Sequence, residues 1–403
     1  MNKKLMAVAV AGAFAVPTLA VAQVTVSGKL GIQLTNVKIS DLAAARAAGT
    51  PSSTTMVNDN ASIIRFGARE NLGGGLEAIG QYEIRPLVDS SVGTGTAGAS
   101  NSGALPVGSA TGVNFVGLRS NAYGTLRAGT MPTWGDGQGS GLSPNASQHY
   151  STSGMTNYIM VAGAPLPFSS SRQPNVIRYD SNNMSGFQVS AAWSSNPHGV
   201  DDDLLRATTR KGQAWYFMPN YTIAGIGKFG WAYADIKREA SNTTAYDIKA
   251  NKLFWEGALA GVQVGLSYAK ITAEAGNAAT AAAAGVLALT PGATQGTKIA
   301  DVTKWWIPVR YKVGKNTFGF MYIKSSDDKA QIGDQGSKQT SLAYNYHFSN
   351  RTNAGITWVK VKNAAASGYD ITSMTGNGYG AGGASLNSGE DMNLISLSLN
   401  HTF

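Results

Sequence analysis

Residue types that commonly perform catalysis or bind metals are scarce in this chain. Its 403 residues include no cysteine, which excludes disulfides, thiolate zinc sites and cysteine nucleophiles together. The four histidines show no metal-ligand spacing, and no Gly-x-Ser-x-Gly turn occurs. We therefore expect no catalytic residue, no metal and no cofactor, and a protease built on carboxylates is the enzyme that the sequence leaves open. The run Asp201 to Asp203 has oxygens of the kind that Ca²⁺ prefers, but a solvated loop explains such a run more simply.

Arginines in alternating segments carry a more specific signal. Three of them stand between apolar residues: Ile64-Arg65-Phe66, Leu126-Arg127-Ala128 and Ile177-Arg178-Tyr179. Successive residues of a β-strand point to opposite faces, so each arginine lies on the face opposite its apolar neighbours. On a lipid-facing surface such a charge would cost ~2–4 kcal/mol at mid-membrane. If the apolar face meets lipid, the guanidinium groups line an interior, where charged side chains select ions at the narrowest point of a pore.

Alternation of apolar and polar residues recurs along the chain and predicts the strands that position these arginines. It holds for about eleven residues at a time, which is the length of a tilted membrane strand rather than of a strand in a soluble sandwich. We expect strands at 23–36, 60–70, 75–86, 112–120, 123–131, 174–181, 186–195, 212–222, 228–237, 245–255, 261–271, 302–313, 316–325, 337–348, 352–362 and 390–403. The segments 212–222 and 245–255 alternate poorly, so fourteen or eighteen strands remain alternatives to sixteen.

The connections between these segments alternate between very short and long. Short turns occur at Asn71 to Gly74, 121–122, 182–184, 314–315 and 350–351, and long polar stretches at 37–59, 87–111, 132–173, 196–211, 272–301 and 363–389. Short turns at one rim and long loops at the other are typical of an outer-membrane β-barrel. We predict an all-β fold, a 16-stranded antiparallel transmembrane barrel, which leaves an aqueous channel because side chains cannot fill its interior.

Composition agrees with a barrel that has one apolar and one polar face. Only 14% of the residues are charged, against about 25% in an average soluble domain. The mean hydropathy is nevertheless only −0.10. Lipid-facing and lumen-facing residues alternate along a membrane strand, so the two contributions cancel in the average.

The first 22 residues predict export across the inner membrane. Lys3 and Lys4 precede an apolar run, and Ala20-Val21-Ala22 is a small-residue cleavage site, so residues 1–22 fit a signal peptide cut between Ala22 and Gln23. An uncleaved anchor is the alternative. The predicted mature barrel, residues 23–403, has 30 basic and 23 acidic residues and a formal charge of +7. We expect it in the outer membrane of a Gram-negative cell.

Five segments, in order, resemble the general porin family of β-proteobacteria. They are Gln23–Gly31, Ser62–Ala78, Val116–Leu118 with Tyr123–Gly129, Arg172–Ser181, and Leu397–Phe403 with its terminal aromatic residue. The resemblance covers essentially the whole mature chain. Two departures stand out: Asn71 replaces the usual Asp, and the third long connection lacks the family's Pro-Glu-Phe-Gly type of turn.

The resemblance implies a homotrimer of diffusion channels with the third long loop folded inward. It also implies a pore constriction of arginines, matched here by Arg65, Arg127 and Arg178, facing the acidic residues Glu77, Glu83 and Asp136. Opposed arginines and carboxylates would create a transverse field across the pore, and an excess of arginine would lower the barrier for anions. Lys29, Arg310 and Lys338 extend this expected field as a track, and Phe403 matches the family's signal for the barrel-assembly machinery.

The function that we predict is an outer-membrane diffusion channel for small hydrophilic solutes and inorganic ions, with a preference for anions. The alternative is a substrate-specific channel for an anionic or aromatic solute class. Expected partners are outer-membrane lipids, lipopolysaccharide, two further copies of the chain and the assembly machinery, and no nucleic acid. An autotransporter or adhesin is disfavoured, because strands and loops use nearly every mature residue.

Overall fold

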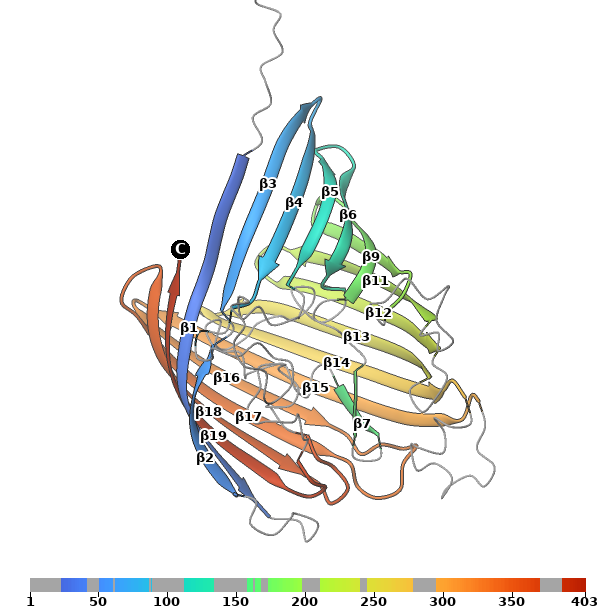
Figure 1. The fold of residues 1–403 in the computed structure, drawn as a ribbon, viewed down its shortest axis with the longest axis vertical. Helices are drawn as coiled ribbons and strands as arrows, with labels where there is room; N and C mark the ends of the chain where they lie inside the picture. Colours follow the sequence, from blue (N-terminus) through green and yellow to red (C-terminus); the bar gives the residue numbers. More distant parts are fainter. Residues whose placement is uncertain are drawn as a thin grey trace, which may run out of the picture.

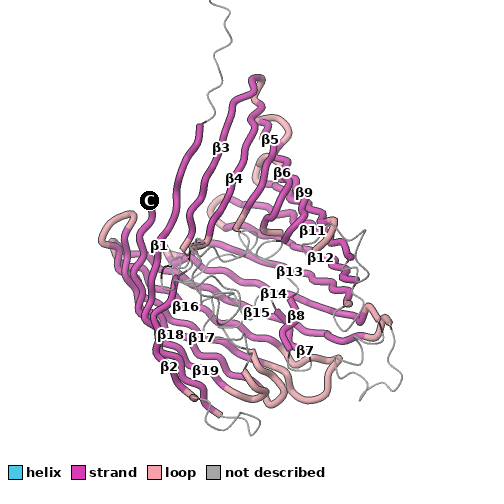
Figure 2. Tube along the Cα trace, in the orientation of Figure 1, coloured by secondary structure: helices cyan, strands magenta, loops and turns pink. Residues whose placement is uncertain are grey.

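The computed structural model describes residues 23–41, 51–60, 62–86, 88, 112–133, 158–161, 164–167, 173–197, 211–239, 245–277, 295–369 and 386–403. Their regular secondary structure is β-strand, coloured magenta in Figure 2. The strands are β1 (Gln23–Ser40), β2 (Ser53–Asp59), β3 (Ile63–Gly73), β4 (Leu76–Ile84), β5 (Asn114–Ser120), β6 (Gly124–Met131), β7 (Tyr158–Val161), β8 (Ala164–Pro167), β9 (Gln173–Asp180), β10 (Phe187–Ser194), β11 (Lys211–Ile223), β12 (Gly227–Glu239), β13 (Tyr246–Leu259), β14 (Val262–Ala275), β15 (Lys298–Val313), β16 (Asn316–Ser325), β17 (Ser337–His347), β18 (Thr352–Asn363) and β19 (Asp391–Thr402). Predictions for residues 1–22, Asp136 and Asp201 to Asp203 lie outside the described residues.

All strands except β7 and β8 belong to one antiparallel sheet (Figure 1). β2 and β3 are two parts of one spanning strand, because both pair with β1, on successive stretches of it. Counted in this way, the described residues form sixteen spanning strands, the predicted number. The doubtful segments become regular strands, β11 and β13.

The sheet closes on itself through the two ends of the chain. β1 pairs with β19 from Lys29 opposite Thr402 to Ser40 opposite Asp391. Gly28 and Phe403 exchange two further backbone hydrogen bonds of 3.0 Å. A Cβ atom at Gly28 would lie 2.4 Å from the carbonyl oxygen of Ile63 and 2.7 Å from the Phe403 ring, so this closure requires glycine. The result is a barrel without a free edge.

The main difference from the predicted boundaries lies in residues 37–59, which we expected to be a loop. β1 continues to Ser40, and β2 begins at Ser53 with β-branched residues that pair with β1. The break between β2 and β3 lies between Asp59 and Ile63, at the start of the strand predicted at 60–70. There the Asp59 Oδ2 atom accepts a hydrogen bond of 3.0 Å from the Ser62 backbone N–H, and the Asn60 Nδ2 atom donates one of 2.8 Å to the Asn400 Oδ1 atom.

Exposure alternates along the strands, so each has one outward and one inward face. In β19, Ile395, Leu397 and Leu399 are exposed, whereas Ser396 and Ser398 between them are buried. No helix among the described residues is long and apolar enough to cross a membrane.

Strand length divides the barrel into two walls, which we name the short wall and the long wall. The short wall is the consecutive set β4, β5, β6, β9 and β10, whose strands have 7 to 9 residues. The long wall is β11 to β15, whose strands have 13 to 16 residues. A membrane strand needs about 9–11 residues to cross the hydrocarbon core. The long wall exceeds this length, and the short wall barely reaches it or falls below it.

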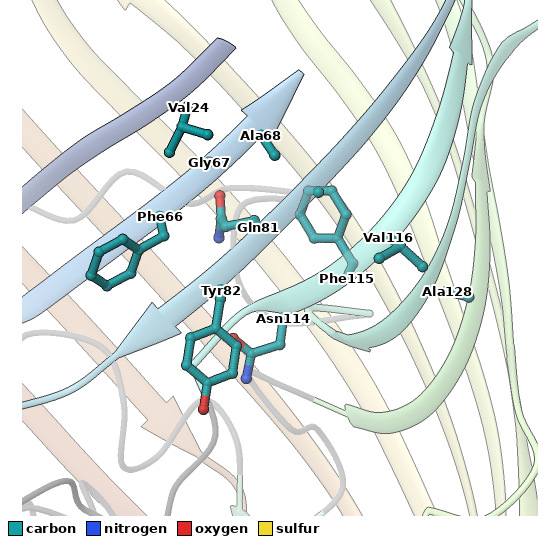
Figure 3. Close-up of a pocket in the computed structure, with 11 residues that line it drawn as sticks. Val24, Phe66, Gly67, Ala68, Gln81, Tyr82, Asn114, Phe115, Val116 and Ala128 are labelled. Carbon is teal, nitrogen blue, oxygen red and sulfur yellow. The ribbon is translucent and has the colours of Figure 1, made fainter. Parts of the chain in front are cut away.

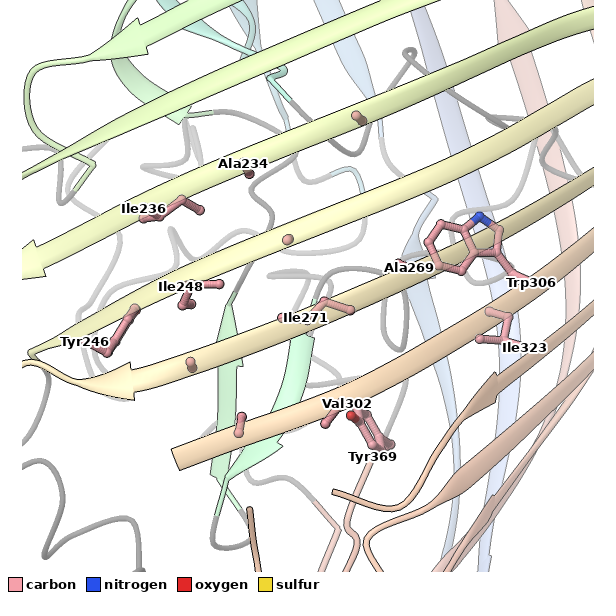
Figure 4. Packing of buried hydrophobic residues seen from close by; sticks show 14 of the residues in the cluster. Ala234, Ile236, Tyr246, Ile248, Ala269, Ile271, Val302, Trp306, Ile323 and Tyr369 are labelled. Carbon is pink, nitrogen blue, oxygen red and sulfur yellow. The ribbon is translucent and has the colours of Figure 1, made fainter. Parts of the chain in front are cut away.

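The inner face of the long wall is apolar over much of its length, contrary to the expectation that every strand is polar on its inner face. Small and branched residues alternate into the barrel there and are almost completely buried: Ala234, Ile236, Ile248, Ala250, Ala269, Ile271 and Val302 (Figure 4). A face of this kind is stabilised by packing against other parts of the chain rather than by contact with water.

Candidate functional site

Arg65, Arg127 and Arg178 lie on the inner face of the barrel, on β3, β6 and β9. Their apolar strand neighbours face outward, where Phe66, Leu126 and Ile177 are 41–50% exposed. The alternation within each strand thus directs the three guanidinium groups toward the lumen. Because β3, β4, β5, β6 and β9 are consecutive in the sheet, the arginines occupy one side of the barrel.

Each of these inward arginines belongs to a group in which two arginines share one carboxylate. The described residues contain three such groups, which we name after their acids: the Glu83 group (Arg65, Glu83, Arg85), the Glu77 group (Arg69, Glu77, Arg119) and the Asp180 group (Arg127, Asp180, Arg178). Each group has two positive and one negative formal charge. This part of the wall therefore has an excess of three positive charges within the groups.

The Glu83 group lies where β4 ends. The Arg65 Nε atom is 2.8 Å from the Glu83 Oε2 atom, and the Arg85 Nη2 atom is 2.7 Å from Oε1. The Glu83 backbone N–H donates a 2.7 Å hydrogen bond to the Asn114 Oδ1 atom. The Glu83 side chain is fully buried, whereas that of Arg65 is 43% exposed, so Arg65 presents its charge to the lumen while Glu83 holds it in place.

The Glu77 group lies near the short turns and is more open. Arg69 forms an ion pair with Glu77, and the Arg119 Nη1 atom lies 3.7 Å from the Glu77 Oε2 atom. The side chains of Arg69 and Arg119 are 58% and 47% exposed. Water screens such exposed pairs, so this group contributes charge to the lumen and little stability to the fold.

The Asp180 group is the most enclosed, and its two arginines differ. Arg178, with only 3% of its side chain exposed, donates from Nε and Nη2 to the Asp180 carboxylate at 2.7–3.1 Å. The Ser190 hydroxyl donates a further hydrogen bond, of 2.6 Å, to the same carboxylate. Arg127 forms an ion pair with Asp180 and lies over the Phe115 ring at 5.2 Å, and its side chain is 24% exposed. Arg127 is therefore the arginine of this group that reaches the lumen.

Arg178 also contacts the base of the third long connection, residues 132–172. Its Nη1 atom donates a hydrogen bond to the carbonyl oxygen of Pro132, the first residue after β6. At the other end of the connection, Gln173 donates 2.9 Å to the Pro197 carbonyl oxygen and accepts 3.2 Å from the Tyr216 hydroxyl. Both ends of the connection are thus fixed to the wall by buried polar side chains.

Part of the same connection reaches the opposite side of the barrel. Its hairpin of β7 and β8 pairs Tyr158 with Pro167 and Val161 with Ala164, and β7 lies against β15 (Figure 1). Because β6 and β9 are on the short wall and β15 is on the long wall, the connection crosses from one wall to the other.

The positions of the acidic residues differ from those expected. Glu77 and Glu83 lie on β4, on the same side of the barrel as the arginines that they pair with, and the expectation that they face these arginines across the lumen is wrong. The reason is register: Glu83 is directly opposite Arg65 on the neighbouring strand. Asp136, the third expected acid, lies outside the described residues.

The three residues expected to extend the track also differ from one another. Lys29 and Arg310 lie on inner faces, and the Arg310 Nε atom donates a 2.6 Å hydrogen bond to the Gln263 Oε1 atom. Lys338 shares its face of β17 with the exposed Leu342 and points outward, so its expected place in the track is wrong.

Two members of the groups, Arg85 and Arg119, were missed by the sequence analysis. A usable signal existed in each case, because Arg119 follows the outward Leu118 and Arg85 stands two residues after Glu83. The described residues contain no group of three His, Asp or Glu side chains that would hold a metal ion.

Comparison with known proteins agrees with this architecture. The family model described as Gram-negative porin matches residues 7–366. No curated protein matched the sequence. Among solved structures, the chain is similar to an anion-selective porin from Comamonas acidovorans, with a TM-score of 0.70 and 19% identity over 95% of this chain and 100% of that one.

Two further structures show the same fold at lower identity. They are the in-vitro folded OmpT of Vibrio cholerae in its trimer form (TM-score 0.60, 13% identity, 95% of this chain and 99% of that one) and Salmonella typhi OmpF in complex with daunomycin (TM-score 0.60, 12% identity, 94% and 97%). The family and the fold point to a channel of the outer membrane rather than to an enzyme. On the family match over most of its length and on its closed sixteen-stranded barrel, the chain belongs to the Gram-negative porins.

Proposed function

We propose that this porin is a diffusion channel for small hydrophilic solutes and ions that passes anions in preference to cations. The observation that carries the proposal is the 2:1 ratio of arginine to carboxylate in the Glu83, Glu77 and Asp180 groups. Guanidinium groups stay charged at any physiological pH, so the excess charge is permanent. A wall of one sign raises the local concentration of ions of the opposite sign.

Within these groups, we assign the pore constriction to Arg65 and Arg127 as the arginines offered to solutes, with Arg178, Glu83, Glu77 and the undescribed Asp136 as its further members. The exposure of Arg65 and Arg127 supports this assignment. The anion selectivity stated for the Comamonas porin is consistent with it.

We also propose that the channel is a homotrimer. β5 and β6 of the short wall have 7 and 8 residues, fewer than the roughly 9–11 that a strand needs to cross the hydrocarbon core. Another protein surface would therefore have to cover them. The outer face of β1 and β3 to β6 has a hollow of about 550 Å³ bordered by Phe66, Tyr82 and Val116 (Figure 3). Ala68, Gly80 and Ala128 leave room in it for side chains of a second copy. The Vibrio OmpT was solved as a trimer.

Export and assembly complete the proposal. A signal peptide, residues 1–22, is removed between Ala22 and Gln23, the residue at which β1 begins. The barrel-assembly machinery reads the last strand and Phe403, whose backbone bonds to Gly28 complete the closure of the barrel. Mass spectrometry of the protein purified from outer membranes tests the cleavage, and a mature N-terminus other than Gln23 would overturn it.

Reversal potentials across planar bilayers in a KCl gradient test the anion preference. We expect the unmodified channel to favour chloride, and Arg127→Gln to lower the chloride-to-potassium permeability ratio by up to about fivefold, which corresponds to one unit charge at contact distance in water. Clear cation preference of the unmodified channel would sink the proposal. Blockade by one solute class at low concentration would instead favour a substrate-specific channel for an anionic or aromatic solute.

A further inference from the structure

Lys304, on the inner face of β15, is a basic residue that lies outside the three arginine groups. Its side chain is completely buried, and β15 belongs to the long wall rather than to the side of the barrel with the arginines. Its neighbours in register are Ala269 on β14 and Ser325 on β16. Burying a polar group costs free energy unless the group forms hydrogen bonds, so the partner of this amino group indicates what the residue does.

Tyr369 contacts Lys304 inside the barrel. The Lys304 Nζ atom donates a 3.1 Å hydrogen bond to the Tyr369 hydroxyl and lies 4.6 Å from the centre of the Tyr369 ring. The hydroxyl is also 3.4 Å from the Ser325 Oγ atom. Tyr369 is only 1% exposed and belongs to the buried cluster on the inner face of the long wall (Figure 4). The chain therefore turns inward after β18 ends at Asn363.

Residues 363–369 and 386–391, which we name the neck, hold together the two ends of the last long connection. The Asn363 side chain bonds to both ends: its Nδ2 atom donates to the carbonyl oxygens of Tyr369 at 2.9 Å and Glu390 at 2.7 Å. Its Oδ1 atom accepts a 3.2 Å bond from the Tyr369 N–H. A Cβ atom at Gly368 would lie 2.3 Å from the Leu386 carbonyl oxygen, so the two ends are in close contact.

The neck is also bonded to the neighbouring connection, 326–336. The Ala364 N–H donates 3.0 Å to the Gly336 carbonyl oxygen, and the Ala366 N–H donates 2.9 Å to the Asp334 carbonyl oxygen. Backbone hydrogen bonds thus fix the neck to the rim, and the contact between Lys304 and Tyr369 fixes it to the inner face of the long wall.

We propose that the neck is a size filter at the loop-side entrance of the channel, held against the long wall by the Lys304–Tyr369 pair. This proposal rests on the diffusion of hydrophilic solutes proposed above. The neck takes up space inside the barrel, and the diameter of a pore limits the solutes that pass. Because the neck lies on the long wall and the arginine groups lie on the other side, different residues select solutes by size and by charge.

Thiol labelling tests whether the pair holds the neck in place. The chain has no cysteine, so Ser367→Cys introduces a single thiol at a fully buried position of the neck. We measure its reaction with a water-soluble maleimide in the whole folded channel. Tyr369→Phe removes one hydrogen bond and should raise the labelling rate by roughly fivefold.

Lys304→Met should raise the labelling rate further, because it also removes the contact with the ring. The substitution keeps the length of the side chain, and an apolar group of similar volume is tolerated in a buried site. The double variant should label no faster than Lys304→Met alone, since the two side chains act as a pair.

Swelling of proteoliposomes in neutral sugars, from a pentose to a trisaccharide, tests the size filter. We expect Tyr369→Ala, which changes no charge, to raise the rate for the trisaccharide relative to the pentose by about twofold or more. The chloride-to-potassium permeability ratio should stay the same. The matched control is Tyr344→Phe, which removes a 2.8 Å hydrogen bond to Asn316 on the outer face of the barrel and should change neither the labelling nor the sugar ratio.

Two failures are distinguishable. If sugars pass the unmodified channel but Tyr369→Ala and Tyr344→Phe have the same sugar ratio, the size filter is wrong. If no sugar passes the unmodified channel, the proposed diffusion function is wrong, and the filter is wrong with it. Unchanged labelling in both Tyr369→Phe and Lys304→Met would overturn the role of the pair.

Discussion

The two walls of this barrel share an alternating strand pattern but differ in the residue types on their inner and outer faces. The short wall, together with the neighbouring β3, has arginines on its inner face and a hollow bordered by small residues on its outer face. The long wall places alanine and isoleucine inside and aromatic residues such as Trp215, Trp231 and Trp305 outside. Charge that acts on solutes is thus concentrated on one side, and the other side receives the hairpin of the connection that starts beside those charges.

This difference shows that the inner surface of a large barrel is not uniformly a water-filled lining. Polar inner residues are needed only where water remains. Where another part of the chain covers the wall, apolar residues stabilise it through burial, as in a soluble protein.

Placing a charge on each wall tests this comparison with the largest expected effect. Ile271→Asp introduces a carboxylate on the long wall at a position with no exposure, and an uncompensated buried charge costs about 3–5 kcal/mol. Ile79→Asp on the inner face of β4 is the control, because it lies beside Arg69 in register. Unfolding in urea, followed by tryptophan fluorescence, should show a large loss only for Ile271→Asp. An equally small loss of stability in both variants would mean that the inner face of the long wall is as hydrated as that of the short wall.

Removing a shared carboxylate sharpens the comparison within the short wall. In Asp180→Asn the nearly buried Arg178 loses its opposing charge, and we expect a loss of stability of about 2–3 kcal/mol. Glu77→Gln in the open group should cost less than about 1 kcal/mol, because its arginines are solvated. Both variants raise the positive excess of the wall by one charge, so both should increase the preference for anions. Reversal potentials and urea unfolding measure the two effects separately, and a decrease in anion preference would contradict the assignment.

Replacing arginine by lysine tests two roles of the arginines separately. One role is to fix the base of the connection 132–172, and the other is to attract anions. Arg178→Lys keeps the charge, but one ammonium group cannot replace the planar fork that bonds Asp180 and the Pro132 carbonyl oxygen together. Losing one charge-assisted hydrogen bond at the base of the connection costs about 1–2 kcal/mol. We expect unchanged selectivity with more current noise and closure at lower voltage. Arg127→Lys is the control and should not increase the current noise, since the contacts of Arg127 among the described residues are with Asp180 and Phe115 on the wall.

The sequence predicts most strands of the fold, but it predicts less well which side chains contact one another inside the barrel. Period-two alternation places most strands within a few residues, and β16 at its observed bounds, because lipid on one side and water on the other act on every strand. The alternation also gives the inward face of Arg65 but not its partner, because register across strands decides that Glu83 stands beside it. The alternation also gives the outward position of Lys338 when it is counted from Leu342, because the two residues are four apart and share one face of β17. The buried role of Arg178 depends on Pro132, 46 residues away in the chain, and no local pattern encodes that contact.

The connection 326–336 between β16 and β17, next to the long wall, gives the smallest predicted effect. Asp328, in the connection 326–336, accepts hydrogen bonds of 2.8 Å from the Asp301 N–H and 2.9 Å from the Ala330 N–H. Burial raises the pKa of its carboxyl group from 3.8 to about 6, against the opposing effects of the Ala330 N–H and Lys270, and Asp327 adds to the rise.

A carboxyl group with a raised pKa stabilises the folded hairpin most at low pH, where it is protonated in both the folded and the open hairpin. This stabilisation is lost as pH rises from about 4 through about 6, since the folded hairpin then holds back an ionisation that the open one allows. Hydrogen exchange at 326–336, corrected for intrinsic rates, should therefore show more protection at pH 4.5 than at pH 7.5. Asp328→Asn keeps an oxygen acceptor without a titrating proton and should remove the pH dependence. If the Asp328→Asn variant retains the full pH dependence, another group of the rim, Asp327 first, is responsible for it. The barrel strands β15 and β16 are the internal reference, because their protection should not change with pH.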